Sequence, residues 1–196
     1  TVLMDEVEPN RRYEVVITNF YGKPLLRYRM HDVIRFVSLQ DEETGVNLPQ
    51  MVFVGRAGDF IDLAGFTGLM DEKMVWQAII NTSIPFEEWC MRKESAAGRP
   101  FLHLYIELKD GEAAHFIRER VHENLKALNP FYADYEAMID PNPLAVTVLP
   151  QGTFQAFMMA KQAAGADLAH LKPPHMNARQ EDIELLLLSA KPLRPA

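Results

Sequence analysis

The first 54 residues show the alternation of apolar and polar side chains that is typical of β-strands. Residues 13–18 are β-branched and aromatic, and shorter stretches of the same kind follow at 25–28, 33–38 and 51–54. Polar turns containing glycine and proline separate these stretches. The pattern therefore predicts a small β-rich segment over residues 1–54.

A glycine-rich stretch follows, in which Gly55, Gly58, Gly65 and Gly68 fall within fourteen positions. Such spacing is typical of a hinge or a set of tight turns, since glycine adopts backbone angles that other residues avoid. We therefore expect three parts: a β-rich segment at 1–54, a hinge at 55–69, and a second domain at 70–196.

The second domain alternates between helical and extended patterns. Asp71 is placed to cap a helix that ends near Asn81, and residues 112–128 form the longest helical pattern, with Phe116, Val121, Leu125 and Leu128 as its inner face. Strands are predicted at 86–93, 101–108 and 145–149, helices at 112–128 and 154–164 with Gly165 as the terminating residue, and either helix or strand at 132–139 and 181–189.

Over residues 70–165 the predicted order is helix, strand, strand, helix, strand, helix. This order predicts the α+β class, with a small antiparallel sheet covered by helices on one side.

Charge and cysteine content narrow the class of protein. The 196 residues carry 20 Lys and Arg against 27 Asp and Glu, a formal charge of −7, which argues against a general nucleic-acid binder. The lone Cys90 excludes an internal disulfide and suits a reducing, cytoplasmic compartment. No apolar run approaches the roughly 20 residues of a membrane span, and no secretory signal is visible. Because the chain begins with Thr1, we expect a piece of a longer protein, with a trimmed native protein as the alternative.

The first candidate for chemistry is segment 26–32, Leu-Arg-Tyr-Arg-Met-His-Asp. Asp32 falls where the predicted strand ends, and a carboxylate at such a point can accept two hydrogen bonds, for example from vicinal ribose hydroxyls. The alternative is a solvated Arg–Asp pair on a surface strand, which contributes little.

The second candidate is segment 55–59, Gly-Arg-Ala-Gly-Asp. The Arg56 guanidinium, flanked by flexible backbone, is suited to forked contacts with phosphate or ribose oxygens. A turn with a solvated arginine is the alternative. The segment is not a phosphate-binding P-loop, because no Lys-Ser or Lys-Thr pair follows the glycines.

The third candidate is segment 152–175, which contains Gly-Thr-Phe at its start and Leu-Lys-Pro-Pro-His at its end. Lys172 precedes two prolines, so its backbone is held extended and its charge can be delivered to an anion. An ordinary solvated lysine is the alternative. His170 and His175 are more often exposed than metal-bound in such a loop, and no third ligand has a helpful spacing, so we expect no metal.

Taken in order, these segments resemble a known family. The strand at 13–18, the segment ending at Asp32 and the segment around Arg56 resemble the end of the large domain and the hinge of adenylate-forming enzymes, the acyl-CoA synthetases and their relatives. Gly-Thr-Phe at 152–154, Gly-Ala-Asp at 165–167 and Leu-Lys-Pro-Pro at 171–174 resemble the C-terminus of the Gretchen Hagen 3 (auxin-responsive promoter) family. The resemblance covers nearly the whole chain.

The resemblance implies an ATP- and Mg²⁺-dependent ligase that converts a carboxylic acid to an acyl-adenylate and passes the acyl group to an amino acid amine or to coenzyme A. Asp32 matches the residue that holds the ribose hydroxyls, Tyr28 the aromatic residue beside the nucleotide, Arg56 the hinge-region arginine, and Lys172 the mobile catalytic lysine. Gly58 and Asp59 match the hinge, where the family often has an acidic pair. His31 stands where glycine is usual.

The family's phosphate-binding loop and acyl pocket have no counterpart in these 196 residues. The resemblance therefore implies the C-terminal portion of a ligase, inactive alone and partnered by its own N-terminal domain. The rival interpretations are a stand-alone α+β module that binds a small molecule or regulates without catalysis, and a protein–protein interaction domain. The acyl substrate and the acceptor cannot be read from the sequence.

Overall fold

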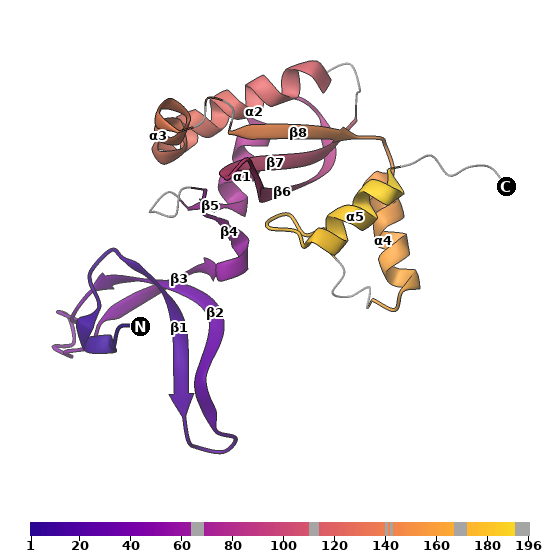
Figure 1. Ribbon diagram of the computed structural model, residues 1–196. Helices are drawn as coiled ribbons and strands as arrows, with labels where there is room; N and C mark the ends of the chain where they lie inside the picture. The colour runs from indigo at the N-terminus through magenta and orange to yellow at the C-terminus, as the bar shows by residue number, and fades with distance from the viewer. Residues whose placement is uncertain (64–68, 110–113, 140, 142, 167–171, 191–196) are drawn as a thin grey trace. The chain divides into compact units, whose positions relative to one another are not determined.

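The computed structural model describes residues 1–63, 69–109, 114–139, 141, 143–166 and 172–190 (Figure 1). They form two compact units, Thr1–Asp59 and Phe60–Ala196, called unit 1 and unit 2 below. The division falls inside the glycine-rich stretch at 55–68. Residues 64–68 of the expected hinge lie outside the described residues, so the three-part division at 1–54, 55–69 and 70–196 stays a prediction.

Unit 1 is built on an antiparallel sheet of three strands in the order β1-β2-β3. Its elements are η1 (Met4–Glu6), β1 (Arg12–Asn19), β2 (Leu25–Ser38), β3 (Gln50–Arg56) and the 3₁₀ turn η2 (Ala57–Asp59). The two strands predicted at 25–28 and 33–38 are one long strand. They are continuous because Arg29 and Asp32, between them, remain paired with β1 and β3.

Unit 2 contains a three-stranded sheet in the order β6-β7-β8. Its strands are β6 (Phe86–Ala96), β7 (Arg99–Leu108) and β8 (Leu144–Leu149), and a separate small ladder joins β4 (Phe60–Ile61) to β5 (Met70–Asp71). Ala97 and Gly98 join β6 to β7 with φ of 50° and 79°, the left-handed pair of a tight hairpin turn. β8 runs parallel to β7, so the sheet is mixed and not wholly antiparallel as predicted.

Three helices pack on one face of this sheet: α1 (Glu72–Ile80), α2 (Ala114–Leu128) and α3 (Pro130–Met138) (Figure 1). The core between them is almost wholly apolar and closed to solvent. Its most buried members are Val75, Ala78, Ile79, Ile117, Val121 and Leu125 from the helices and Trp89, Met91, Leu102, Leu104 and Ile106 from the strands. The helix predicted at 71–81 is confirmed as α1.

The inner face of α2 differs from the prediction at one position. Val121 and Leu125 are buried and Leu128 packs partly against the core, but Phe116 is 52% exposed and Ile117 is buried in its place. Residues 117, 121 and 125 follow a four-residue spacing and form one stripe, from which Phe116 is turned by about 100°.

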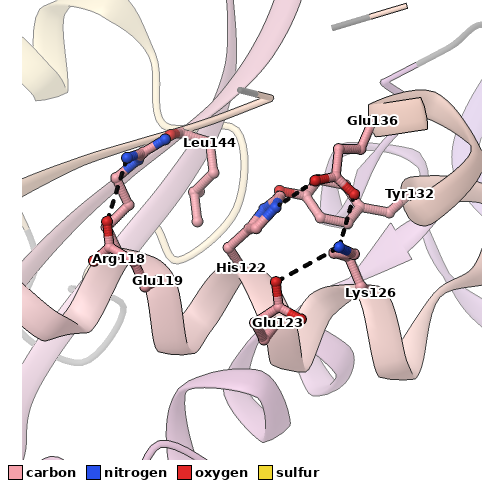
Figure 2. A network of polar contacts seen from close by, with 8 residues as sticks. All are labelled: Arg118, Glu119, His122, Glu123, Lys126, Tyr132, Glu136 and Leu144. Carbon is pink, nitrogen blue, oxygen red and sulfur yellow. Dashed lines mark hydrogen bonds and ion pairs between the residues drawn. The ribbon is translucent and has the colours of Figure 1, made fainter. Parts of the chain in front are cut away.

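A polar network joins α2 to α3 (Figure 2). His122 Nδ1 lies 2.7 Å from the Tyr132 hydroxyl and Nε2 lies 3.1 Å from Glu136 Oε1. Lys126 Nζ contacts the other Glu136 oxygen at 2.9 Å, and this contact is the main reason that the pKa of Glu136 is lowered. The segment at 132–139, ambiguous in sequence, is thus a docked helix.

Two further helices, α4 (Thr153–Ala163) and α5 (Gln180–Ser189), pack on the opposite face. Cys90, Tyr105 and Leu149 point to this side because strand residues alternate between faces, and they meet Phe154, Phe157, Ile183 and Leu186 from the helices. Helices therefore cover both faces, and the prediction of one covered side is wrong. The α+β class itself is confirmed.

Short-range signals set the ends of several helices. The Asp71 carboxylate accepts a hydrogen bond from the Met74 backbone N–H at 2.8 Å and caps α1. The Asn129 side chain accepts hydrogen bonds from the backbone N–H groups of Phe131 and Tyr132 at the start of α3. After α4, Gly165 has φ of 92°, the left-handed conformation expected of a helix-terminating glycine.

Candidate functional site

Asp32 and Arg56 lie opposite each other where β2 and β3 end their pairing. Asp32 Oδ1 is 3.8 Å from Arg56 Nε, and the arginine side chain is 74% exposed while the aspartate is 28% exposed. The pair is therefore open to solvent and loosely held, so both side chains retain capacity for hydrogen bonds to a ligand. The sequence separates these residues by 24 positions, and the antiparallel register brings them together.

An irregularity in β2 positions Asp32. Glu14 of β1 pairs with Val33 but Val16 pairs with Arg29, so β2 carries two extra residues at this point. Such bulges re-aim side chains and often lie beside functional sites. His31, within the bulge, has φ of 61°. This left-handed angle favours glycine, which gives a physical reason for the glycine usual at this position in the family it resembles.

Gly58 and Asp59 form the turn that follows β3. Asp59 Oδ2 accepts a hydrogen bond from the Arg56 backbone N–H at 3.3 Å, which fixes the turn immediately after the arginine. A Cβ placed on Gly58 would meet no atom within 4 Å. The turn therefore fixes the backbone of Arg56, and the space around Gly58 stays open.

Tyr28 lies on β2 opposite Ile17 of β1 and is exposed. On the same stretch of strand, Arg29 makes a two-point contact with Glu14, at 2.9 and 2.5 Å, which lowers the pKa of the Glu14 carboxyl. His31 Nδ1 also lies 3.2 Å from Glu14. Glu14 thus ties the bulged segment to β1, a role that the sequence pattern did not indicate.

Lys172 lies in unit 2, on the extended segment that leads to α5, and its side chain is exposed. Three residues later the chain is held against the edge of β6. The Met91 backbone N–H donates to the His175 carbonyl at 2.7 Å, and the Asn177 N–H donates to the Met91 carbonyl at 2.9 Å. Lys172 therefore stands at the end of an anchored segment. Leu171 and Asp167, which belong to the same motif, lie outside the described residues.

His175 strengthens this anchor. Its Nδ1 lies 2.6 Å from Glu72 Oε1, its Nε2 lies 2.8 Å from Glu88 Oε1, and its ring stacks on Trp89 with 4.8 Å between centroids. Hydrogen bonds to these carboxylates, Glu88 first, raise the pKa of His175 above its usual value. The sequence predicted an exposed histidine here. Its partners lie 103 and 87 residues away, so no local signal indicates the contact.

The Gly-Thr-Phe motif starts α4, and a buried carboxylate caps it. Glu107 is 4% exposed and accepts hydrogen bonds from the N–H groups of Gly152, at 2.5 Å, and Phe154, at 3.0 Å. A carboxylate is stabilised there by the partial positive charge of a helix N-terminus. A cavity of about 570 Å³ opens beside it, and Pro173, next to Lys172, forms part of its wall. A lone acidic residue in the apolar run at 102–108 was the only sequence signal for Glu107.

Among the described residues, no three His, Cys, Asp or Glu side chains are placed to hold one metal ion. His170 lies outside the described part of the chain. Within that same part, no helix is long and apolar enough to cross a membrane.

Comparison with known proteins gives a consistent result for the fold. A solved structure described as GH3.15 acyl acid amido synthetase is 24% identical, matches 96% of this chain and 35% of its own, and superimposes with a TM-score of 0.58. A second solved structure, described as AtGH3.15 acyl acid amido synthetase in complex with 2,4-DB, is 23% identical. It matches 96% of this chain and 34% of its own, with a TM-score of 0.56. The chain therefore has the fold of the corresponding third of an acyl acid amido synthetase.

Sequence comparison places the chain in a family. The family models described as GH3 family central domain and GH3 family C-terminal domain match residues 1–56 and 72–181. A curated relative, the probable indole-3-acetic acid-amido synthetase GH3.1 of Arabidopsis thaliana, is 24% identical over 200 residues, which are 92% of this chain and 32% of that protein. The chain belongs to the GH3 family, and it spans about a third of the length of these relatives.

Proposed function

We propose that this chain forms the C-terminal part of an ATP-dependent ligase that joins a carboxylic acid to an acceptor. In the first half-reaction a carboxylate oxygen attacks the α-phosphorus of ATP, and pyrophosphate leaves as the P–O bond to it breaks. In the second, the acceptor nitrogen or sulfur attacks the acyl carbon, AMP leaves and the acceptor's proton is lost to solvent. The observation that carries the proposal is the Asp32–Arg56 pair, presented on the bulged sheet end of a GH3-family chain.

In unit 1, Asp32 would accept hydrogen bonds from the two ribose hydroxyls, and Arg56 would contact ribose or phosphate oxygens. The open pair supports these roles, because a carboxylate and a guanidinium 3.8 Å apart can each turn to a ligand without leaving a buried charge unpaired. Tyr28, exposed on the same strand, would lie beside the nucleotide.

In unit 2, Lys172 would supply the positive charge for the first half-reaction. Two anions, a carboxylate and a phosphate, must approach each other there, and a cation beside them stabilises the charge of the transition state. The exposed position of Lys172 at the end of the segment anchored by His175 supports this role. Gly58 and Asp59 would form the hinge about which unit 2 turns between the half-reactions.

Other parts of the reaction chamber would come from an N-terminal domain of the same protein. Unit 1 supports this partnership, because it exposes an unusual number of large apolar side chains for so small a unit. Those more than half exposed are Leu3, Met4, Phe20, Tyr21, Leu26, Tyr28, Leu48, Met51 and Phe53. A stand-alone binding module would not need such a surface.

The names of the relatives favour an amino acid as acceptor over coenzyme A, and Mg²⁺ would accompany the ATP.

The test is ATP–pyrophosphate exchange, measured with a panel of carboxylic acids. The 196-residue chain alone should show none, while the intact enzyme should show exchange. In the intact enzyme, Lys172→Ala should slow exchange about 100-fold, since one lost charge contact to a transition state costs that much, with little change in the KM for ATP. Asp32→Asn should mainly raise that KM.

Lys73→Ala is the matched control, because Lys73 is an exposed lysine on α1 of the same unit. It should leave exchange unchanged. Robust exchange by the 196-residue chain would show that the site is complete without another domain, and an unchanged rate in Lys172→Ala would remove that residue from the mechanism.

A further inference from the structure

The sheet face that carries α4 and α5 also carries a group of polar side chains. Glu94 of β6 accepts a hydrogen bond from the Tyr105 hydroxyl at 2.9 Å and lies 2.9 Å from His103 Nδ1. The other His103 nitrogen lies 2.9 Å from the Thr147 hydroxyl, and the rings of His103 and Tyr105 stack 4.1 Å apart. These contacts join the side chains into one group, and none of its members belongs to the site proposed above.

Arg92 is the member of this group whose hydrogen bonds are incomplete. Its Nε lies 3.4 Å from Glu94 Oε1, and its side chain is only 19% exposed. Its Nη1 is buried and has no hydrogen-bond partner within the described ranges. An unsatisfied buried donor costs about 1–3 kcal/mol, more when it is charged, so such an atom indicates a missing acceptor.

Space for that acceptor lies next to the arginine. Arg92 lines a cavity of about 570 Å³ whose wall is formed by β6, β7 and α5. Its apolar wall consists of Pro100, Ile183 and Leu187. The guanidinium therefore faces a space that is polar on one side and apolar on the other.

The charges around the cavity limit what it can hold. Two cations, Arg92 and Lys93, and one anion, Glu94, line it. Lys93 is occupied elsewhere, since its Nζ donates to the Asp62 carbonyl at 2.6 Å. Burial by itself raises the pKa of the Glu94 carboxyl, but the hydrogen bonds from His103 and Tyr105 outweigh it and lower that pKa below its usual value. A hydrogen bond to a carbonyl leaves the charge of Lys93 in place, so two cations and one anion give the cavity wall a net charge of +1. One negative charge on a ligand matches this excess, whereas a dianion exceeds it.

We propose that this cavity binds a small organic monocarboxylate with an apolar tail, at a site separate from the adenylation site. The carboxylate accepts hydrogen bonds from the Arg92 guanidinium, including Nη1, and the tail packs against Ile183 and Leu187. The inference goes beyond the proposed ligase activity, because every residue that carries it lies in unit 2 and none has a role in adenylation.

The probe is 3-methylbutanoate, titrated into the ¹⁵N-labelled 196-residue chain and followed by amide chemical shifts and by calorimetry. We expect shifts at residues 92–95 and 180–187 and a measurable Kd. The neutral analogue 3-methylbutanamide, which has the same shape without the charge, should bind at least tenfold more weakly. Inorganic phosphate should also bind at least tenfold more weakly, because it lacks the apolar tail and carries more charge.

Two variants identify the residues responsible. Arg92→Met should weaken binding of 3-methylbutanoate at least tenfold, since hydrogen bonds to a charged group contribute about 1.5–3 kcal/mol. Arg11→Met, at an exposed arginine of unit 1, should leave it unchanged. Should Arg92→Met fail to fold, Leu187→Glu keeps the test open: Leu187 is 40% exposed at the cavity wall, and a negative charge there should also weaken binding at least tenfold.

Three outcomes would overturn the proposal. They are no binding of 3-methylbutanoate at millimolar concentration, equal binding of the amide, and unchanged binding by the Arg92 or Leu187 variant. Because the assay needs no ATP and no other domain, failure here leaves the ligase proposal standing. Loss of exchange activity in the intact enzyme would in turn leave this site untouched.

Discussion

At the residue scale, the site in unit 1 depends on one strained backbone position. His31 holds a left-handed φ of 61° inside the bulge that separates Tyr28 from Asp32. A residue with a Cβ loses about 1–2 kcal/mol in this conformation, whereas glycine does not. The contact of His31 Nδ1 with Glu14 offsets little of that cost, because the histidine side chain is 63% exposed.

We therefore expect His31→Gly to raise the free energy of unfolding of unit 1 by about 0.5–1 kcal/mol, after allowance for the greater backbone entropy of unfolded glycine. Urea unfolding followed by circular dichroism measures the change. Met30→Gly is the matched control, because Met30 precedes His31 on the same strand without a positive φ, and it should lose about 1 kcal/mol. A loss of stability in His31→Gly equal to that of the control would show that the angle carries no strain.

At the scale of the element, the segment before α5 is held by a titrating contact. His175 lies between Glu72 at the start of α1 and Glu88 on β6, with Trp89 beneath its ring. Its pKa is raised in the folded state, so the folded protein binds this proton more tightly than the unfolded chain. The resulting stability is fully present below the unfolded pKa of about 6.5 and is lost as the pH rises through the higher folded value.

Comparison of wild type with His175→Gln should show this directly. Wild type should be more stable by about 2 kcal/mol at pH 5.5, and the difference should shrink as the pH is raised toward 9. Urea unfolding followed by Trp89 fluorescence in a Trp76→Phe background reports on this region alone. His31→Gln, at an exposed histidine of unit 1, should leave the Trp89 transition unchanged, because Trp89 lies in unit 2. A difference that is constant across the pH range would contradict a stabilising contact of the protonated His175 ring with Glu72 and Glu88.

Local signals predicted elements well and their partners poorly. Alternation and capping indicated the strands of both three-stranded sheets, the start of α1 after Asp71 and the end of α4 before Gly165, but not the short ladder of β4 and β5. Periodicity could not choose between Phe116 and Ile117, which are neighbours on the helix, nor show that β8 runs parallel to β7. Asp32 and Arg56 were found as separate motifs, but the contacts of Glu107 and His175 join residues 45 to 103 positions apart, which one sequence does not reveal.

At the scale of the whole molecule, the two units differ sharply in how much apolar surface they bury. In unit 1, all of whose residues are described, Val33 and Phe36 are the only buried apolar side chains. Unit 2 contains both large core clusters. A unit of about 60 residues is marginal even with a full core, so unit 1 is weakly stabilised on its own.

We therefore expect two separate unfolding events in the 196-residue chain. Hydrogen exchange measured by mass spectrometry at increasing urea should show amides of β1–β3 losing protection at lower concentration than those of β6 and β7. In a longer chain that includes the proposed N-terminal domain, which would cover the exposed side chains of unit 1, the two sets should lose protection together. A single transition in the 196-residue chain would show that unit 1 needs no further partner.

The pairing of residues 175–177 with the edge of β6 also limits how far Lys172 can be displaced from that strand. From Lys172 to His175 the backbone spans three residues, a tether of about 10 Å when fully extended. Pro173 and Pro174 restrict the backbone angles of this segment, so its end-to-end length can change little. A displacement of the Lys172 backbone beyond this length therefore requires unit 2 to move as a whole.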